Sequence, residues 1–572
     1  MTRLRPVART ASLSALLACA AACAVPGHAT VKPPGSPAAA HVGGTLRIGI
    51  AAPSGVDPIA ATNPSAQLVD GLLCDTLLTV DPQSGEPAPG LVSGWTFSGS
   101  TLTLQLRHGV HFSDGSSLTA SDVAFSLGRL ANPSFASPAA GLLNGVLGYS
   151  GLQSNLFAKP TDGLAGVQVV NDHTVQVTLS AKDTAFLYDL AMPATAPVSA
   201  NAERAHPKSF VDDPVCVGPY RLRAPYRPGA KTIALTRVPG YYAQNPSYTG
   251  GGRGYAARVT FEVFGSQRAG YQAYRHGKLD LLSLPPADRG RPVPAGSALA
   301  SRAATTEEFI GLPNGADATL SSVAVRHALS ESLDREAVAA KVWGGGALPA
   351  TGYLPAGFGA SSAGTSCGAF APITGNAAQA RASLTPAELS DLRKKPLTLT
   401  VESDPRSLAE AATVADEWRQ ALGVRVKIAA EPWSTYLQQA TVGSGFLTPF
   451  RIAWQAGAIS PSPTSLDPGG FLYSLFSQNS TTLANWAHYS DLRFDTTYSL
   501  GVQPASPGAA RDSVLKAVAE RLCQQMPIIP LAVESSQWLV RSSAWASTRS
   551  SYLAVGGTPL LRELYLERGV LR

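Results

Sequence analysis

The stretch HFSDGSSLTASDVAFSLGRL, residues 111–130, concentrates a histidine, two aspartates and several hydroxyl groups in one short run. Such residue types could ligate a metal ion or transfer a proton. Their order favours a structural role, because Asp114 and Gly115 form a turn in which glycine supplies the positive φ. Thr119 is then placed to cap the amide of Asp122, which lies in the first turn of a helix where the dipole favours a negative charge. We predict a turn followed by a capped helix.

Catalytic and metal-binding patterns do not stand out elsewhere. We expect no G-x-S-x-G nucleophile elbow, and the sequence has no H-E-x-x-H, no P-loop and no G-x-G-x-x-G after a strand. His108 and His111 are spaced as HxxH, but residues i and i+3 of a strand point to opposite faces, so a shared metal is not expected. The absence of a CxxC or Cys/His cluster argues against structural zinc. We therefore predict no catalytic residues, no metal and no cofactor.

Composition and charge describe a large globular chain. At 572 residues the chain is too long for one hydrophobic core, so two or more lobes are expected. Hydrophobic residues make up 45% and charged residues 15%, which is typical of a folded protein. The net charge of +6 is small for this length and includes Arg3, Arg5 and Arg9 of the N-terminus. Nothing in this balance indicates nucleic-acid binding.

The N-terminus resembles an export signal. A basic start is followed by a short apolar run, which is too short to remain as a spanning helix, and we assign residues 1–18 to a signal peptide. LLAC, which ends at Cys19, resembles a bacterial lipobox; Cys23 is the competing lipidation site, and a cleaved signal without lipid is the other alternative. Residues 19–42 are rich in Pro, Ala and Gly and are expected to form a flexible tether.

The remaining chain divides by its patterns into lobes. Residues 43–305 are predicted to form a first lobe, with an inserted strand-rich subdomain over about 76–205. Residues 306–526 are predicted to form a second, α/β lobe, and 527–572 to return to the first. Two crossings between lobes would make a hinge.

The second lobe contains a β-α-β pattern. A strand at 396–403, a helix at 406–422 ended by Gly423 and a strand at 424–431 predict parallel strands with a right-handed crossover. Further helices are expected at 323–343 and 510–526.

Two tryptophans are the first candidates for ligand contact. Trp433 follows the strand pattern VRVKIAAE, and Trp454 closes FRIAW. In open α/β sheets, ligands bind beyond the carboxyl ends of strands. Indoles there would offer broad apolar walls with one donor each, which suits a sizeable organic ligand; burial of both in the core is the alternative.

An ordered series of motifs resembles the bacterial family 5 extracellular solute-binding proteins, the receptors of peptide and nickel ABC importers. The longest match runs from GLLCDTLLTV to SDVAFSL; GPYRL, YRHGKLDLL, VRHALSESLDREAVAAKVWGGGALPATGYLP, LGVRVKIAAEPWSTYL and PIIPLAVE follow in order. The resemblance implies a two-lobed, periplasmic-binding-protein-like α/β fold of type II, in the large class with an extra subdomain in the first lobe. It also implies a two-segment hinge near 307–312 and 527–533, with ligand held between the lobes.

The same resemblance exposes one departure. Peptide-binding members commonly carry W-x-x-D at the second tryptophan, where the aspartate holds the ligand's α-amino group; this sequence has Gly457 at that position. Asp467 could supply the missing charge. Asn485 and Trp486 lie in a run that resembles an asparagine-containing loop of the family and are weaker candidates, with a plain surface loop as the alternative.

The cysteines beyond the tether are disulfide candidates. Cys74, Cys216, Cys367 and Cys523 allow three pairings, which their spacing does not decide. The lobe assignment favours Cys74 with Cys216 in the first lobe and Cys367 with Cys523 in the second.

The predicted function is that of a monomeric, lipid-anchored receptor on the outer face of the cell membrane. It would capture a peptide or peptide-like solute and deliver it to an ABC permease and ATPase complex. The alternatives are an oligosaccharide or metal-chelate cargo, or a surface sensor on the same fold.

Overall fold

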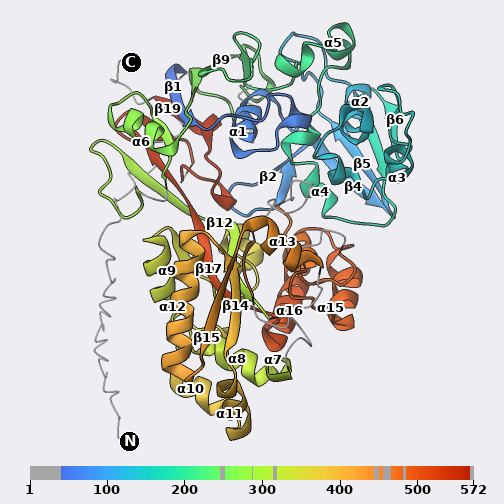
Figure 1. Cartoon of the computed structure of the whole chain (residues 1–572). Coiled ribbons are helices and arrows are strands. Elements are labelled where there is room, and N and C mark those ends of the chain that lie inside the picture. Colours follow the sequence, from blue (N-terminus) through green and yellow to red (C-terminus); the bar gives the residue numbers. More distant parts are fainter. Residues whose placement is uncertain are drawn as a thin grey trace, which may run out of the picture.

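The computed structural model describes residues 40, 42–244, 252–285, 288–312, 318–442, 450–454, 466–480, 485–549 and 551–566. The chain forms two lobes, one above the other in Figure 1, which meet at a narrower waist. Two long strands, β12 (Ala298–Gly311) and β17 (Ile528–Val540), run through this waist from one lobe to the other. The two-lobed α/β architecture expected from the motifs is confirmed.

One mixed sheet continues through both lobes. Its strand order is β15-β14-β16-β12-β17-β11-β1-β10-β9-β8, with β13 added at β17. β12 and β17 are antiparallel, from the pair Ala298 and Val540 to the pair Gly311 and Ile528. Their register shifts between Ala303 and Glu307, so the ladder is irregular where the chain passes between the lobes.

The β-α-β unit of the second lobe matches its prediction. β14 (Leu397–Glu402) and β15 (Val426–Glu431) are parallel neighbours, joined by α12 (Pro405–Leu422). Asp404 caps the helix by accepting the N–H groups of the first turn, and Gly423 ends it with a φ of 74°. α12 buries Trp418 completely against the rest of the lobe.

The helix predicted at 323–343 is in fact two helices. α8 (Val323–Glu331) stops, and α9 (Arg335–Trp343) begins after Asp334, whose carboxylate accepts the Ala337 N–H. An aspartate that can cap a new helix competes with continuing the old one, which is why the continuous prediction was wrong. The helix predicted at 510–526 is α16 (Ala509–Gln525).

The predicted turn and helix of residues 111–130 are present in the first lobe as Gly115, with a φ of 92°, and α2 (Ala120–Ala131). Thr119 and Asp122 form a capping box, in which the predicted contact of the Thr119 side chain with the Asp122 amide is matched by a reciprocal one. The Asp122 carboxylate accepts both the Thr119 N–H at 3.0 Å and the Thr119 hydroxyl at 2.7 Å, and it also accepts the Ala200 N–H at 3.1 Å. This carboxylate therefore joins two helix starts, because α5 begins at Ala200.

α2 packs beside an antiparallel sheet of order β4-β5-β7-β6. The other first-lobe elements are listed here in chain order: β1 (Gly43–Ile50), α1 (Pro64–Leu73), β2 (Leu78–Val80), β3 (Pro87–Pro89), β4 (Val92–Ser98), β5 (Thr101–Leu106), α3 (Tyr149–Gln153), β6 (Val167–Asn171), β7 (Thr174–Thr178), α4 (Phe186–Asp189), α5 (Ala200–Ala205), β8 (Tyr220–Leu222), β9 (Thr232–Arg237), β10 (Ala256–Val263), α6 (Gln267–Arg275), β11 (Leu281–Ser283), β18 (Trp545–Ser547) and β19 (Leu564–Leu566).

The second lobe is completed by short helices around the sheet. They and the remaining strands are α7 (Ala318–Ser321), β13 (Ala347–Pro349), α10 (Ala377–Ala382), α11 (Pro386–Lys394), α13 (Trp433–Val442), β16 (Phe450–Trp454), α14 (Pro468–Phe476) and α15 (Leu492–Thr497).

Each lobe carries one disulfide. Cys74 is bonded to Cys216, and Cys367 to Cys523, with Cα–Cα distances of 4.9 and 5.2 Å. These are the within-lobe pairs that the sequence favours, and neither bond crosses the waist. The two lipidation candidates, Cys19 and Cys23, lie outside the described residues.

Candidate ligand-binding site

The carboxyl ends of three strands meet at the waist. β14 and β15 end at Glu402 and Glu431, and β16, also parallel to β14, ends at Trp454. Trp454 pairs with Glu307 of β12, beside the irregular ladder where the chain enters the second lobe. This edge therefore faces the junction of the lobes, where an α/β sheet offers a ligand site.

Trp433 presents an indole at this edge. It is the first residue of α13, directly after β15, and is 41% exposed, whereas Tyr436 one turn on is 2% exposed. The two ring centroids are 5.9 Å apart. An exposed indole supported by a buried aromatic ring is a fixed apolar wall. Two other ligand contacts were predicted at this edge, Trp454 and Gly457. The structure describes the backbone of Trp454 alone, and Gly457 lies outside the described residues.

The carboxylate of Asp467 is not accessible to a ligand in this structure. It caps α14, with the Gly470 N–H donating to its carboxylate at 2.6 Å, and is fully buried. Arg511, also buried, pairs with it at 2.8 Å. The carboxylate is thus neutralised inside the second lobe, which argues against the ligand role considered for it.

Asn485 and Trp486 also hold the second lobe together. The Asn485 amide donates to the carbonyls of Ser477 and Tyr489 and accepts the Tyr489 N–H at 2.9 Å. Trp486 is 1% exposed within the hydrophobic core. Their positions argue against ligand contact, and Trp486 lies in the core rather than in the surface loop that was the alternative.

A buried carboxyl does lie beside Trp454, but its environment favours the neutral form. Glu307 is 1% exposed, and one of its carboxyl oxygens has no hydrogen-bond partner among the described residues. Burial raises its pKa well above the usual range, against the opposing effect of Arg335. Glu307 therefore does not replace the negative charge that Gly457 lacks.

A pocket of about 280 Å³ opens at the waist. We call it the waist pocket; it is lined by Arg289, Lys341, Val342, Trp343, Gly344 and Arg406. Arg406 follows the carboxyl end of β14, and Trp343 ends α9. Arg289 comes from the segment between β11 and β12, so both lobes contribute. Sequence reasoning did not single out these residues as a site. Residues 341–344 lay inside a quoted family motif and Arg406 opened a predicted helix, but neither pattern indicates a pocket.

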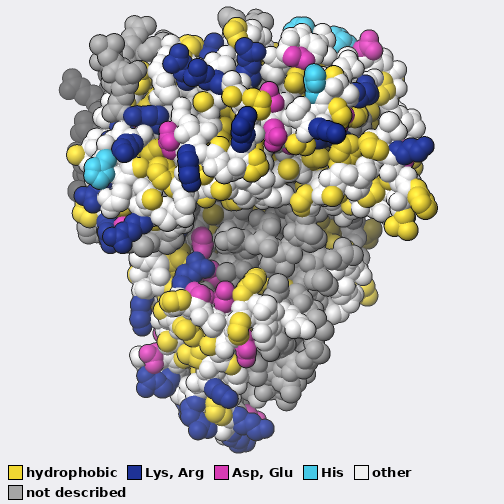
Figure 2. All heavy atoms as spheres, turned by 45° about the horizontal axis from the view of Figure 1, so that its top comes forward, with side chains coloured by type: hydrophobic (Ala, Val, Ile, Leu, Met, Phe, Trp, Pro, Cys, Tyr) yellow, Lys and Arg dark blue, Asp and Glu magenta, His cyan; other side chains and the backbone are white. Residues whose placement is uncertain are grey.

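The charges at the waist are of both signs. Arg406, 41% exposed, donates to Glu534 of β17 at 2.8 Å and lies 3.5 Å from the buried Glu308 of β12. Figure 2 shows acidic and basic side chains side by side in the hollow between the lobes. Arg406 is thus held in place by the two strands that cross the waist.

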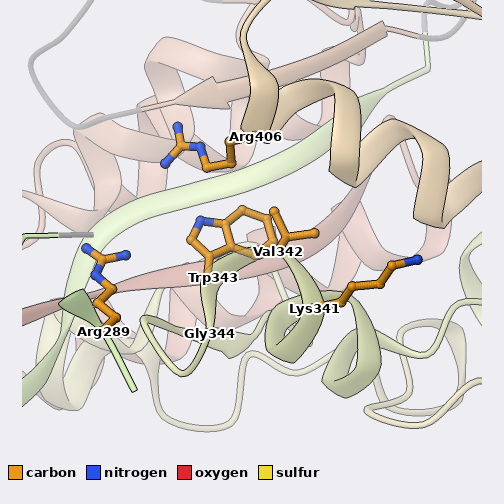
Figure 3. Close-up of a pocket in the computed structure, with 6 residues that line it drawn as sticks. All are labelled: Arg289, Lys341, Val342, Trp343, Gly344 and Arg406. Atoms are coloured by element: carbon orange, nitrogen blue, oxygen red, sulfur yellow. The ribbon is translucent and has the colours of Figure 1, made fainter. Parts of the chain in front are cut away.

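Two other donors of the waist pocket have no acceptor within the described chain. The Nε atom of Arg289 and the Nε1 atom of Trp343 are buried without a hydrogen-bond partner. In Figure 3 a backbone segment passes between Arg406 and the side chains of Trp343 and Arg289, and the Lys341 ammonium points away from them. Burial lowers the pKa of Arg289.

The letters of the G-x-S-x-G motif of serine hydrolases do occur in the chain. Residues 364–368 spell G-x-S-x-G around Ser366. That motif requires a strand, a sharp turn and a helix. Here Ser366 precedes a short 3-10 turn, and Cys367 forms the second disulfide. The motif's residues are therefore present without the strand, turn and helix that a nucleophile elbow needs.

Metal-binding groups do not gather either. The ring centroids of His108 and His173 are 4.0 Å apart, with the ring planes tilted by 57°. Over the described ranges there is no cluster of three side chains that could hold a metal ion.

The chain has two lobes on a shared sheet, joined by two crossing strands, with an exposed indole and a pocket at the junction. These features define a two-lobed solute-binding protein. The chain belongs to the bacterial extracellular solute-binding proteins, family 5, whose model matches residues 86–480. It is similar to the periplasmic oligopeptide-binding protein OppA of Escherichia coli strain K12, with 25% identity over 508 residues and 84% of each chain covered. It is also similar to the probable deoxycholate-binding periplasmic protein YgiS of that strain, with 26% identity over 480 residues, 82% of this chain and 84% of YgiS.

Solved structures show the same fold. The unliganded open form of the periplasmic murein tripeptide binding protein MppA has a TM-score of 0.74 at 22% identity and covers 93% of this chain and 99% of its own. The family consists of solute carriers, and the protein is not an enzyme. In the part of the chain with assigned structure, every helix is too short or too polar to cross a bilayer.

Proposed function

We propose that this protein is an extracytoplasmic receptor that captures a peptide or peptide-like solute between its lobes and delivers it to an ABC importer. The observation that carries the proposal is the strand edge at the waist, where the Trp433 indole is 41% exposed. The similarity to oligopeptide-binding and murein-peptide-binding proteins supports a peptide cargo.

The crossing strands would act as the hinge, with residues 43–305 and 527–572 on one side and 306–526 on the other. β12 and β17 are the long strands that pass through the waist, and their ladder is irregular between Ala303 and Glu307. A few residues at such a break can absorb the backbone rotation of lobe closure. A ligand that touches both lobes favours the closed form, which the permease can distinguish from the empty one.

The anchor is proposed from the N-terminal sequence. Lipidation of Cys19, or of Cys23, would place the receptor on the outer face of the cell membrane as a monomer, held by acyl chains and the tether. Mass spectrometry of the mature N-terminus tests this assignment: a diacylglyceryl-modified cysteine is expected, and an unmodified N-terminus would exclude it.

The experiment for cargo class is a thermal-shift screen with native mass spectrometry. Peptides of graded length are compared with oligosaccharides and nickel chelates. A ligand at a hundred times its dissociation constant should stabilise the protein by about 2.7 kcal/mol. Replacing Trp433 by alanine should weaken peptide binding by about tenfold or more. Leu492→Ala, which alters an exposed residue of the same lobe, is the control. Melting shifts given only by sugars or chelates would refute a peptide cargo.

A further inference from the structure

We propose that the outer face of the first-lobe sheet docks on an anionic lipid surface, so that the receptor rests on the membrane between deliveries of cargo. We call this surface the basic face; it consists of Arg221, Arg223 and Arg258 with the threonines between them. The inference goes beyond the proposed function and shares with it only the location at the outer side of a membrane.

The first argument is the uneven distribution of charge along the chain. Residues 220–278 hold ten Lys and Arg residues but a single acid, Glu262, whereas the whole chain has a net charge of +6. The rest of the chain is therefore net negative. Figure 2 shows Lys and Arg side chains gathered at the top of the first lobe, the end where Figure 1 places β1 and β9. This end of the molecule attracts anionic surfaces.

The second argument is that the strand register brings the arginines onto one open face of the sheet. Thr236 of β9 pairs with Arg221 of β8 on one side and with Arg258 of β10 on the other. Residues paired in this way point to the same face, and both arginines are exposed. Arg223, two residues after Arg221, is exposed as well. Leu235, one residue before Thr236, points to the opposite face and is completely buried.

The third argument is that little within the protein neutralises this face. Arg221, Arg223 and Arg258 have no ion-pair partner among the described residues. Two acids lie near them: Glu262, four residues after Arg258 on β10, and Asp213, whose carboxyl is close enough to Arg221 to be influenced by its charge. The positive charge that remains is complementary to anionic lipid headgroups.

The position of the tether favours a membrane over other anionic partners. β1 begins at Gly43, and its Thr45 pairs with Arg258, so the tether joins the fold beside the basic face. Residues 19–42 can extend over about 80 Å. They contain Lys32 and no acid, so they cannot neutralise the face themselves. Because the tether keeps the face close to a membrane, a weak attraction is sufficient for docking.

Docking through the basic face leaves the waist free. The strand order of the shared sheet places β8 at one edge and β15 of the second lobe at the other, with the crossing strands β12 and β17 between them. The membrane would therefore hold the first lobe alone. The second lobe can still rotate about the crossing strands and close on a cargo.

The test is vesicle binding by the mature chain, residues 24–572, which keeps every described residue and lacks both lipidation candidates. Vesicles contain either phosphatidylcholine alone or equal parts of phosphatidylcholine and phosphatidylglycerol, and co-sedimentation measures the bound fraction. Raising the salt concentration from about 0.1 M to about 1 M shortens the Debye length from about 10 Å to about 3 Å. The variant combines Arg221→Gln with Arg258→Gln. The control combines Lys395→Gln with Lys427→Gln, which removes the same charge from exposed residues of the second lobe.

We expect the chain to bind the anionic vesicles about tenfold or more tightly than the neutral ones at low salt, and to lose this preference at high salt. The arginine variant should bind anionic vesicles about tenfold or more weakly, and the lysine control should change binding by less than about threefold. Equal binding to both kinds of vesicle, or an equal loss in both variants, would overturn the docking face. Retention by soluble poly(glycerol phosphate) but not by vesicles would also overturn it, because the partner would then be a polymer.

Thermal shifts with peptides on the same preparations separate this inference from the proposed function. Both variants should keep the melting temperature and the peptide-induced shift of the unaltered chain. Peptide binding that persists while vesicle binding fails would overturn the docking face and leave the receptor function standing. Vesicle binding that depends on the arginines would support the docking face even if no peptide binds.

Discussion

Arg129 and Arg289 show two opposite uses of a half-buried or buried guanidinium. Arg129, in the capped helix of residues 111–130, is 2% exposed and donates to both carboxylate oxygens of Asp57, at 2.8 and 2.5 Å. Arg289, in the waist pocket, has no such carboxylate within the described chain. Most polar side chains of the first region have hydrogen-bond partners within the protein, whereas two donors of the waist pocket have none among the described residues.

The difference teaches how polar clusters should be interpreted. Residues 111–130 look reactive in sequence, but Asp122 accepts three hydrogen bonds from within the protein and Asp114 accepts the Ser116 N–H and hydroxyl. The waist pocket looks unremarkable in sequence, yet two of its donors, Arg289 Nε and Trp343 Nε1, lack an acceptor within the described chain. Arg129 Nε is also buried without one, so an unpaired donor points to a ligand only where it borders a pocket.

The largest expected effect comes from breaking the paired arginine. Arg129→Met leaves the Asp57 carboxylate buried and uncompensated, which should cost about 3–5 kcal/mol of folding free energy. Denaturant unfolding of the first lobe measures it. The double variant with Asp57→Asn should recover part of the loss; no difference between single and double variants would mean that the pair is not the cause.

A smaller loss of folding free energy is expected from a substitution at the start of α2. Asp122→Ala removes an acceptor for Thr119 and for the Ala200 N–H, and should cost about 1–3 kcal/mol. Asp114→Ala, in the exposed turn of the same segment, is the control and should stay within about 0.5 kcal/mol. Both variants should bind peptide as the unaltered protein does; loss of binding in Asp122→Ala at a temperature where it is folded would contradict the structural assignment.

Arg289→Gln should leave stability almost unchanged. With no ion pair to lose, the free energy of unfolding without ligand should move by less than about 0.5 kcal/mol. Thermal melts with and without peptide separate the two effects: the unliganded melting temperature should persist while the ligand-induced shift shrinks. A large drop in the unliganded melting temperature would show that Arg289 is structural, like Arg129.

The smallest expected effect is the pH dependence of stability that Glu417 contributes. Glu417 of α12 accepts the Asp334 N–H at 2.8 Å, yet burial raises its pKa to about 7. Its folded-state pKa exceeds the unfolded value, so the folded protein keeps a proton that the unfolded chain has released, and stability should fall as pH rises from about 4.5 to 7. Denaturation midpoints across this range should fall less steeply in Glu417→Gln, and an unchanged slope would exclude Glu417 as the source.

Much of the fold could be predicted from local chemistry. The β-α-β unit was predictable because Asp404 and Gly423 mark both ends of its helix. The break between α8 and α9 was missed because the apolar pattern continues through it, and only the capping position of Asp334 reveals the new start.

The site was less predictable. The exposure of Trp433 was predictable because the residue follows a strand end, and its role as a ligand contact stays a prediction. The burial of the Asp467 carboxylate could not be foreseen, because its partner Arg511 is distant in sequence. Arg289, Trp343 and Arg406 come together only through the crossing of β12 and β17, a tertiary feature that residue types alone do not encode.

Hydrogen–deuterium exchange of the whole protein, with and without a saturating mixture of free-ended tripeptides, tests the account most directly. We expect new protection on both sides of the waist, in segments 288–299, 340–346 and 404–408, and at Trp433, with no change over residues 111–122. Protection confined to one lobe, or centred on residues 111–130, would contradict the claim that the unsatisfied waist, and not the polar-rich helix start, receives the ligand.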